Sequence, residues 1–133
     1  MQLTSKVFAS LSDDVSLGLF TTIANNSVNS VMLRNKAKIT RKQYYTRLSK
    51  IMKAGLIKRN NGKLVLTAFG TIVYEVHKTV ESASSNQWKL RAIDSIELSD
   101  ELPREERRQL LESLIDNKHL REILSTHQDY QAK

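Results

Sequence analysis

The chemistry that this chain can perform rests first on positively charged side chains in its first half. Between Asp14 and Glu75 the sequence contains no acidic residue. The same stretch contains these basic residues: Arg34, Lys36, Lys38, Arg41, Lys42, Arg47, Lys50, Lys53, Lys58, Arg59 and Lys63. Residues 1–66 hold twelve Lys and Arg against two Asp, whereas residues 67–133 hold nine against twelve acids. A field of one sign attracts a polyanion, because each phosphate that it neutralises releases condensed counterions.

Length and composition limit the classes to which the chain can belong. Its 133 residues, 40% of them hydrophobic, can build one modest core, and one Pro and four Gly favour helices over a turn-rich β fold. The absence of Cys excludes disulfides and thiolate metal sites and suits a reducing cytoplasm. No apolar run reaches the roughly 18 residues that span a bilayer. We therefore expect a mainly helical, cytoplasmic protein with no membrane partner.

Capping residues and apolar spacing predict two helices before residue 37. Ser12, followed by two aspartates, predicts a helix over residues 12–24, since a side-chain acceptor and early negative charge stabilise a helix start. Phe8 and Leu11 are expected to form a short helical turn that packs beside it. After the Asn-Asn-Ser break, a second short helix is expected over residues 28–36.

A third helix over residues 40–54 has the clearest boundaries. Thr40 as N-cap with Gln43 makes a capping box, Ile39 can meet Tyr44 as a hydrophobic staple, and Gly55 ends the helix. Apolar side chains share one sector of this helix: Tyr44, Leu48, Ile51 and Met52. Polar and basic side chains point the other way: Lys42, Gln43, Thr46, Lys50 and Lys53. One face therefore belongs to the core, and the opposite face is basic.

The Asn60-Asn61-Gly62 signal predicts a β-hairpin between strands at residues 56–59 and 63–66. Thr67 then caps a long helix to about Leu98, bent near residues 82–86. Apolar residues follow a seven-residue rhythm along it: Phe69, Val73, Val76, Val80, Ala83 and Leu90. Two shorter helical segments follow, one with Pro103 at its first helical position and one after Asn117.

No constellation of residues indicates an enzyme. His77, His119 and His127 are far apart and have no Cys or carboxylate cluster at metal-ligand spacing. The acidic pairs at residues 13–14 and 105–106 stand at helix starts, where the helix dipole explains them. The glycines are isolated, so no phosphate-binding loop is present. We expect no catalytic residue, metal site or cofactor, and no small-molecule effector can be identified.

The order of these elements, together with two segments, resembles the winged helix-turn-helix family, most closely its small archaeal transcriptional regulators. Residues 39–59 (ITRKQYYTRLSKIMKAGLIKR) resemble the recognition helix and first wing strand, and residues 66–70 (LTAFG) resemble the exit into the next helix. The likeness covers about residues 8–80. It implies a fold that is mainly α with a small β-hairpin, with a winged-helix domain at 1–82. Residues 83–133 match no pattern of the family, and we expect them to form a C-terminal helical extension.

The resemblance implies DNA contacts on the outward face of the third helix and at the hairpin tip. The candidate contacts are Arg41, Lys42, Gln43, Tyr45, Thr46, Ser49, Lys50, Lys53, Arg59, Asn61 and Lys63. Tyr45 lies near the edge of the core sector, so it can either pack against the second helix or reach a phosphate or a thymine methyl group.

Two functions remain open. The first is a transcriptional regulator of the nucleoid that binds double-stranded DNA, and it is favoured because a scaffold has no need to exclude acids from sixty residues. The second is a winged-helix module that binds proteins.

The apolar residues that continue the seven-residue repeat past residue 82 must be buried, either by the last helices of the same chain or by a second chain. We favour a homodimer, since a twofold axis would hold two recognition helices about one DNA turn apart.

Overall fold

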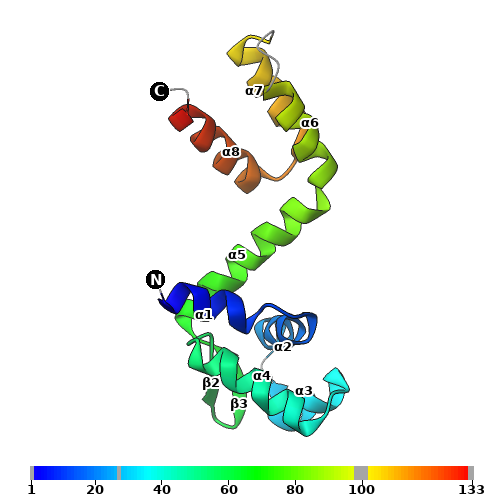
Figure 1. Cartoon of the computed structure of the whole chain (residues 1–133), viewed down its shortest axis with the longest axis vertical. Helices are drawn as coiled ribbons and strands as arrows, with labels where there is room; N and C mark the ends of the chain where they lie inside the picture. The colour runs from blue at the N-terminus through cyan, green and yellow to red at the C-terminus, as the bar shows by residue number, and fades with distance from the viewer. Residues whose placement is uncertain (1, 27, 98–101, 132–133) are drawn as a thin grey trace. The chain divides into compact units, whose positions relative to one another are not determined.

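The structure, a computed structural model, describes residues 2–26, 28–97 and 102–131. The chain divides into an N-terminal unit, residues 1–75, and a C-terminal unit, residues 76–133. The elements in chain order are α1 (Gln2–Ser10), α2 (Asp14–Asn25), β1 (Val28–Asn29), α3 (Ser30–Ala37), α4 (Arg41–Lys53), β2 (Ile57–Asn60), β3 (Lys63–Leu66), α5 (Ala68–Ser85), α6 (Gln87–Glu97), α7 (Arg104–Leu114) and α8 (Lys118–Gln131). Figure 1 labels the helices α1–α8 and the strands β2 and β3.

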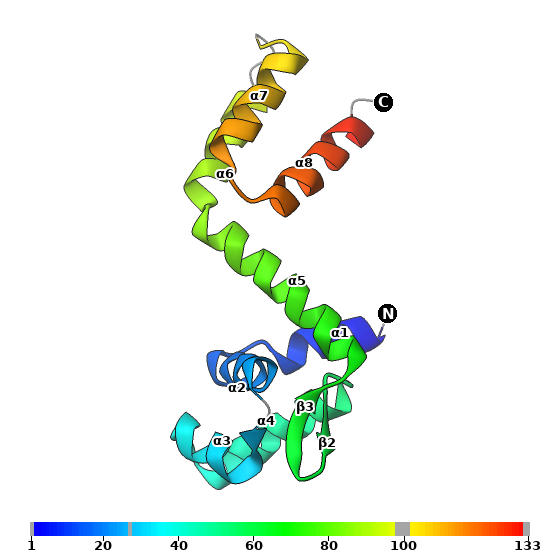
Figure 2. The ribbon, with the colours of Figure 1, turned by 180° about the vertical axis from the view of Figure 1, so that it is seen from behind.

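A small antiparallel sheet has the strand order β1-β3-β2. Its hairpin of β2 and β3 forms the wing (Figure 2). The hairpin pairs Ile57 with Leu66 and Asn60 with Lys63. Its two turn residues, Asn61 and Gly62, have φ angles of 53° and 77°, which a type I′ turn requires. The predicted hairpin is confirmed, although β2 begins at Ile57. The sequence did not predict β1, because two residues are too few to show an alternating pattern.

The core of the N-terminal unit gathers apolar side chains from α2, α3, α4 and the wing. Its most deeply buried members are Leu19, Phe20, Leu33, Tyr44, Leu48, Ile51, Leu56 and Leu64. Tyr44, Leu48 and Ile51 are the residues that the 3.6-residue period assigned to the inner face of α4. The helical phase of α4 is therefore confirmed, and the order of helices and strands is that of a winged helix.

Two expectations about the first helices were wrong. The N-cap of α2 is Asp13, whose carboxylate accepts a hydrogen bond from the Ser16 backbone N–H at 2.9 Å. The Ser12 hydroxyl instead donates to the Ala9 carbonyl at the end of α1. Phe8 does not pack beside α2 but is 70% exposed, because α1 is a nine-residue helix that turns Val7 toward the core.

A tight corner joins the end of α4 to the start of α5. The Thr67 backbone N–H donates to the Leu56 carbonyl at 3.0 Å, and the Thr67 hydroxyl donates to the Gly55 carbonyl. The same hydroxyl oxygen accepts from the Gly70 N–H at 2.9 Å, which caps the first turn of α5. A Cβ atom at Gly70 would lie 1.9 Å from the Leu56 carbonyl oxygen. The LTAFG segment thus requires glycine at its last position.

The long helix is broken at Asn86, as expected, and α6 ends at Glu97. The side-chain amide of Asn86 donates to the Ser82 carbonyl at 2.8 Å. The expected end at Leu98 falls outside the described residues. Pro103 is the N-cap of α7 and not its first helical residue, and α8 continues for 14 residues, well beyond the short segment expected after Asn117.

The C-terminal unit has a core of its own, built by α6, α7 and α8. Its buried members are Ile93, Leu111, Ile115 and Leu120, with Ala83, Leu90, Leu114 and Leu124 packed against them. Part of the apolar series predicted along α5 and α6, at Ala83 and Leu90, is therefore packed against other helices of the same chain.

Among the described residues no single helix is long and apolar enough to cross a membrane. Helices α1 and α2 pass the length and apolarity test only as a pair, and this pair is bent by 98°.

We predict opposite effects for two Gly→Ala substitutions. Gly70→Ala should lower the free energy of unfolding by about 3 kcal/mol or more, because the new methyl group must displace the Leu56 backbone. Gly18→Ala, within α2, meets nothing within 4 Å and should raise stability by about 0.5–1 kcal/mol. Urea unfolding followed by circular dichroism measures both, and equal effects would contradict the close approach at Gly70.

Candidate nucleic-acid interface

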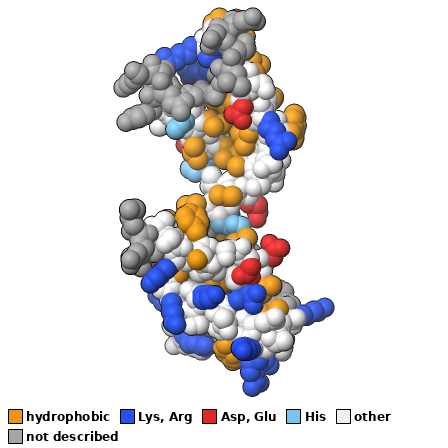
Figure 3. Space-filling view, viewed as in Figure 1, with side chains coloured by type: hydrophobic (Ala, Val, Ile, Leu, Met, Phe, Trp, Pro, Cys, Tyr) orange, Lys and Arg blue, Asp and Glu red, His pale blue; other side chains and the backbone are white. Residues whose placement is uncertain are grey.

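Helix α4 presents a polar stripe to solvent along its whole length. Lys42, Thr46, Ser49 and Lys53 follow one another at helical spacing, and all four are exposed. They lie on the side of the helix opposite the buried side chains of Tyr44, Leu48 and Ile51. Figure 3 shows Lys and Arg side chains gathered over the N-terminal unit on the face in view. Every candidate contact that the sequence predicted is exposed.

The capping box fixes the start of this stripe. The Thr40 side-chain oxygen accepts from the Gln43 backbone N–H at 3.2 Å, and the Gln43 side-chain carbonyl accepts from the Thr40 N–H at 3.3 Å. The predicted box is confirmed. Because the Gln43 carbonyl takes part in the cap, the amide NH₂ group is what this side chain can offer to a ligand.

The Tyr45 side chain packs on its neighbour in the same helix. Its ring lies edge-to-face on Tyr44 of the same helix, with centroids 5.1 Å apart and an interplanar angle of 75°. The side chain nevertheless remains 48% exposed. Tyr44 therefore limits the motion of this ring while leaving half of it free for contact.

Arg47 lies in the acid-free stretch but contributes to the fold. Its Nε atom is 3.1 Å from a carboxylate oxygen of Asp13, so that α4 is tied to the N-terminus of α2. The pKa of Asp13 is lowered to about 2, chiefly by the hydrogen bond from the Ser16 backbone N–H. Partial burial opposes this shift, while the Ser16 hydroxyl and Arg47 reinforce it. One of the two acids among residues 1–66 is thereby neutralised.

The hairpin register reveals a residue that the sequence analysis missed. Lys58 pairs with Val65 and Asn60 with Lys63, whereas Arg59 pairs with the buried Leu64. Since side chains alternate along a strand and directly paired residues share a face, Lys58 and Lys63 lie on the solvent face and Arg59 on the other. The alternation of residues 57–60 could have identified Lys58.

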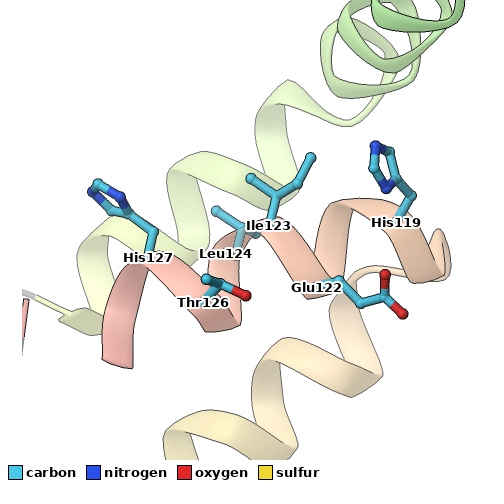
Figure 4. Close-up of a pocket in the computed structure, with 6 residues that line it drawn as sticks. All are labelled: His119, Glu122, Ile123, Leu124, Thr126 and His127. Atoms are coloured by element: carbon cyan, nitrogen blue, oxygen red, sulfur yellow. The ribbon is translucent and has the colours of Figure 1, made fainter. Parts of the chain in front are cut away.

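Helix α8 carries a separate surface hollow of about 680 Å³. Figure 4 shows its lining residues on this one helix, with His119 and His127 near opposite ends and Ile123 between them. Throughout the described ranges there is no group of three or more His, Cys, Asp or Glu side chains that could hold a metal ion.

Comparison with known proteins gives structural neighbours and no sequence relatives. No protein-family model matches the chain, and no curated protein matches it. The activation domain of the phage T4 transcription factor MotA is similar in structure, with a TM-score of 0.51 and 14% identity, over 66% of this chain and 97% of that one. An ArsR-like transcriptional regulator from Rhodococcus sp. RHA1 aligns with a TM-score of 0.49 and 17% identity, over 76% and 96% of the two chains.

We predict that the Asp13 cap makes stability sensitive to acid. Because its folded pKa is about 2, below the unfolded value of about 3.9, its contribution is present above pH 4 and is lost as the pH falls toward 2. Asp13→Ala should lower the free energy of unfolding by about 1 kcal/mol at pH 7 and flatten its dependence between pH 5 and 2. Thermal melts across this range measure both. Asp14→Ala, one residue further along α2, is the control, and an equal loss there would contradict the assignment.

Proposed function

We propose that this protein is a transcriptional regulator that binds double-stranded DNA. The observation that carries the proposal is the polar stripe of α4, formed by Lys42, Thr46, Ser49 and Lys53. This stripe lies on a rigid helix in a unit that contains very few acidic residues. Residues 1–75 contain only Asp13, Asp14 and Glu75 as acids, and Asp13 is paired with Arg47. An isolated helix face of this width fits the major groove of B-DNA.

The roles of the α4 side chains follow from their chemistry. Lys42 and Lys53 can donate to phosphates or to guanine acceptors, while the hydroxyls of Thr46 and Ser49 can both donate and accept at base edges. Arg41 and Gln43 stand in the first turn, where the positive end of the helix dipole also favours a phosphate. Tyr45 flanks this stripe and would reach the sugar-phosphate backbone. Sequence reading is thus assigned to the middle of the stripe.

The hairpin is proposed as a contact to the DNA backbone. Lys58, Lys63 and the turn residue Asn61 are exposed on or beside its solvent face. Lysine is a compact, flexible point charge that suits phosphate contacts and gives little base selectivity. Arg59, on the other face of the hairpin, is assigned a smaller part.

The alternative, a protein-binding scaffold, shares the fold and differs in its charge requirement. The phage T4 neighbour is named as an activation domain, so the fold does not by itself select DNA binding. The concentration of cations on α4 and the hairpin favours DNA. A regulator of this kind performs no catalysis and would act in the cytoplasm on the nucleoid. Residues 1–82 form the DNA-binding domain in this proposal, and residues 83–133 form the extension.

We also infer that the protein acts as a homodimer. The C-terminal core covers Ala83, Leu90 and Ile93, but helix α5 keeps an exposed apolar row at Phe69, Ile72, Val76 and Val80. At 100° per residue these four fall within a sector of about 80°, which is the width of a helix-pairing seam. A second copy of the chain would cover the row and present a second α4.

We predict that Lys42→Ala with Thr46→Ala weakens binding to duplex DNA without unfolding the protein. The wild-type affinity should fall with salt at a log–log slope of about −4 to −5 per protomer. The double variant should lose about 2 kcal/mol or more of binding free energy and keep its melting temperature, since both side chains are exposed. Lys118→Ala with Thr126→Ala removes the same residue types from α8 and is the matched control. Binding that is insensitive to salt would count against the proposal.

A second prediction concerns the hairpin. Lys58→Ala with Lys63→Ala should weaken binding about equally for all DNA sequences and make the salt slope shallower by about 2, because phosphate contacts position the protein and do not specify bases. Arg59→Ala should have a smaller effect. Fluorescence anisotropy at several salt concentrations measures the slopes, and a changed sequence preference would move these lysines into base reading.

A third prediction tests the dimer. Light scattering at micromolar concentration should give twice the chain mass of 15.2 kDa. Ile72→Glu with Val80→Glu should return the mass to that of one chain, because buried carboxylates would oppose pairing along α5. Glu substitutions at the exposed Thr46 and Ser49 of α4 provide the control. A wild-type mass near that of one chain would mean that no second copy covers the apolar row of α5. A palindromic DNA site should then not be expected.

A further inference from the structure

A basic pocket lies between α1 and α4 of the N-terminal unit. Its volume is about 280 Å³. The residues that line it are Lys6, Ala9, Ser10, Lys50, Lys53 and Ala54. Two helices that are far apart in the sequence thus contribute three lysine side chains to the lining of one hollow. The sequence analysis had no reason to single out Lys6, because this residue lies outside the acid-free stretch and far along the chain from α4.

The three lysines differ from Arg47 in their ion pairing. Within the described part of the chain none of them forms an ion pair, whereas Arg47, nearby on α4, is paired with Asp13. Three like charges around one hollow repel one another, and a bound anion relieves that repulsion. The negative end of the α4 dipole accounts for lysines in its last turn, Lys50 and Lys53, but it does not account for Lys6 on α1.

The lining also indicates which chemical group fits. Ala9 and Ala54 have short side chains, which leave room between the helices. The Ser10 hydroxyl donates to the Val7 carbonyl at 2.8 Å, so the charged donors to a ligand come from the lysines. Flexible lysine side chains that line one hollow from two helices suit the spread charge of a phosphate better than the flat carboxylate, which arginine binds in a bidentate manner.

We propose that this pocket binds a phosphate group, from either the backbone of bound DNA or a small phosphorylated molecule. In both cases the anion bridges α1 and the end of α4. If the phosphate belongs to DNA, the pocket is a backbone contact beyond those of α4 and the hairpin, and this case rests on the proposed function. If it belongs to a small molecule, the pocket places a ligand directly against the helix that would read the DNA.

The test uses Lys6→Gln, which keeps most of the side-chain length and removes the charge, with Lys118→Gln on α8 as the matched control. Titration of the full chain with inorganic pyrophosphate, followed by the amide NMR signals of Ser10, Ala54 and Gly55, should show saturable shifts. Lys6→Gln should weaken this binding by about fivefold or more. The same proteins are then titrated with duplex DNA at several salt concentrations, where loss of one phosphate contact makes the log–log slope shallower by about one.

The two measurements separate the sources. Weaker pyrophosphate binding by Lys6→Gln with an unchanged DNA slope supports a small phosphorylated ligand, and a shallower slope supports a DNA phosphate. If Lys6→Gln matches Lys118→Gln in both measurements, the proposal is overturned, even where Lys42→Ala with Thr46→Ala shows that DNA binding itself is real. If no form of the protein binds DNA, the proposed function fails and the pyrophosphate titration alone decides on the pocket.

Discussion

The contact between Gly70 and the carbonyl group of Leu56 is the constraint on which the N-terminal unit depends. Leu56 follows the end of α4, and Gly70 lies in the first turn of α5, so their close approach joins the two helices directly. Thr67 closes the same corner with hydrogen bonds to Gly55, Leu56 and Gly70. The hairpin between these points starts and ends at one place, and its solvent face is therefore held in a defined relation to α4.

Some polar and basic side chains of this unit hold the fold together, and others remain exposed on its surface. Arg47 is used to hold α4 on the cap of α2, and the Gln43 carbonyl is used in the capping box. Among the described residues, no ion pair holds Lys42, Lys50 or Lys53 of the same helix to another element, and the opposite side of the helix is filled by Tyr44 and Leu48. A helix that buries one face so completely must expose the other, and here the exposed face carries the charge that suits a polyanion.

The C-terminal half shows how one periodicity can serve two different contacts. Along α5 and α6 the apolar residues keep nearly the same spacing, yet Ala83 and Leu90 pack in the C-terminal core while Ile72 and Val80 remain exposed. A seven-residue repeat of apolar residues predicts that the apolar stripe of the helix will be buried, but it does not identify the element that buries it. The identity of the covering element depends on where α7 and α8 fold back, and that depends on the break at Asn86 and the turn at Asn117.

The sequence by itself determined the features that arise within a few residues of one another. The capping box of Thr40, the inner face of α4, the Asn61-Gly62 turn and the break near Asn86 all follow from local hydrogen bonding and helical phase. The tertiary structure alone decided which apolar residues of α5 and α6 are covered within the chain, and that Lys6 lines the same pocket as Lys50 and Lys53. These outcomes depend on contacts between helices far apart in the chain, and such contacts leave no repeating pattern that a single sequence can show.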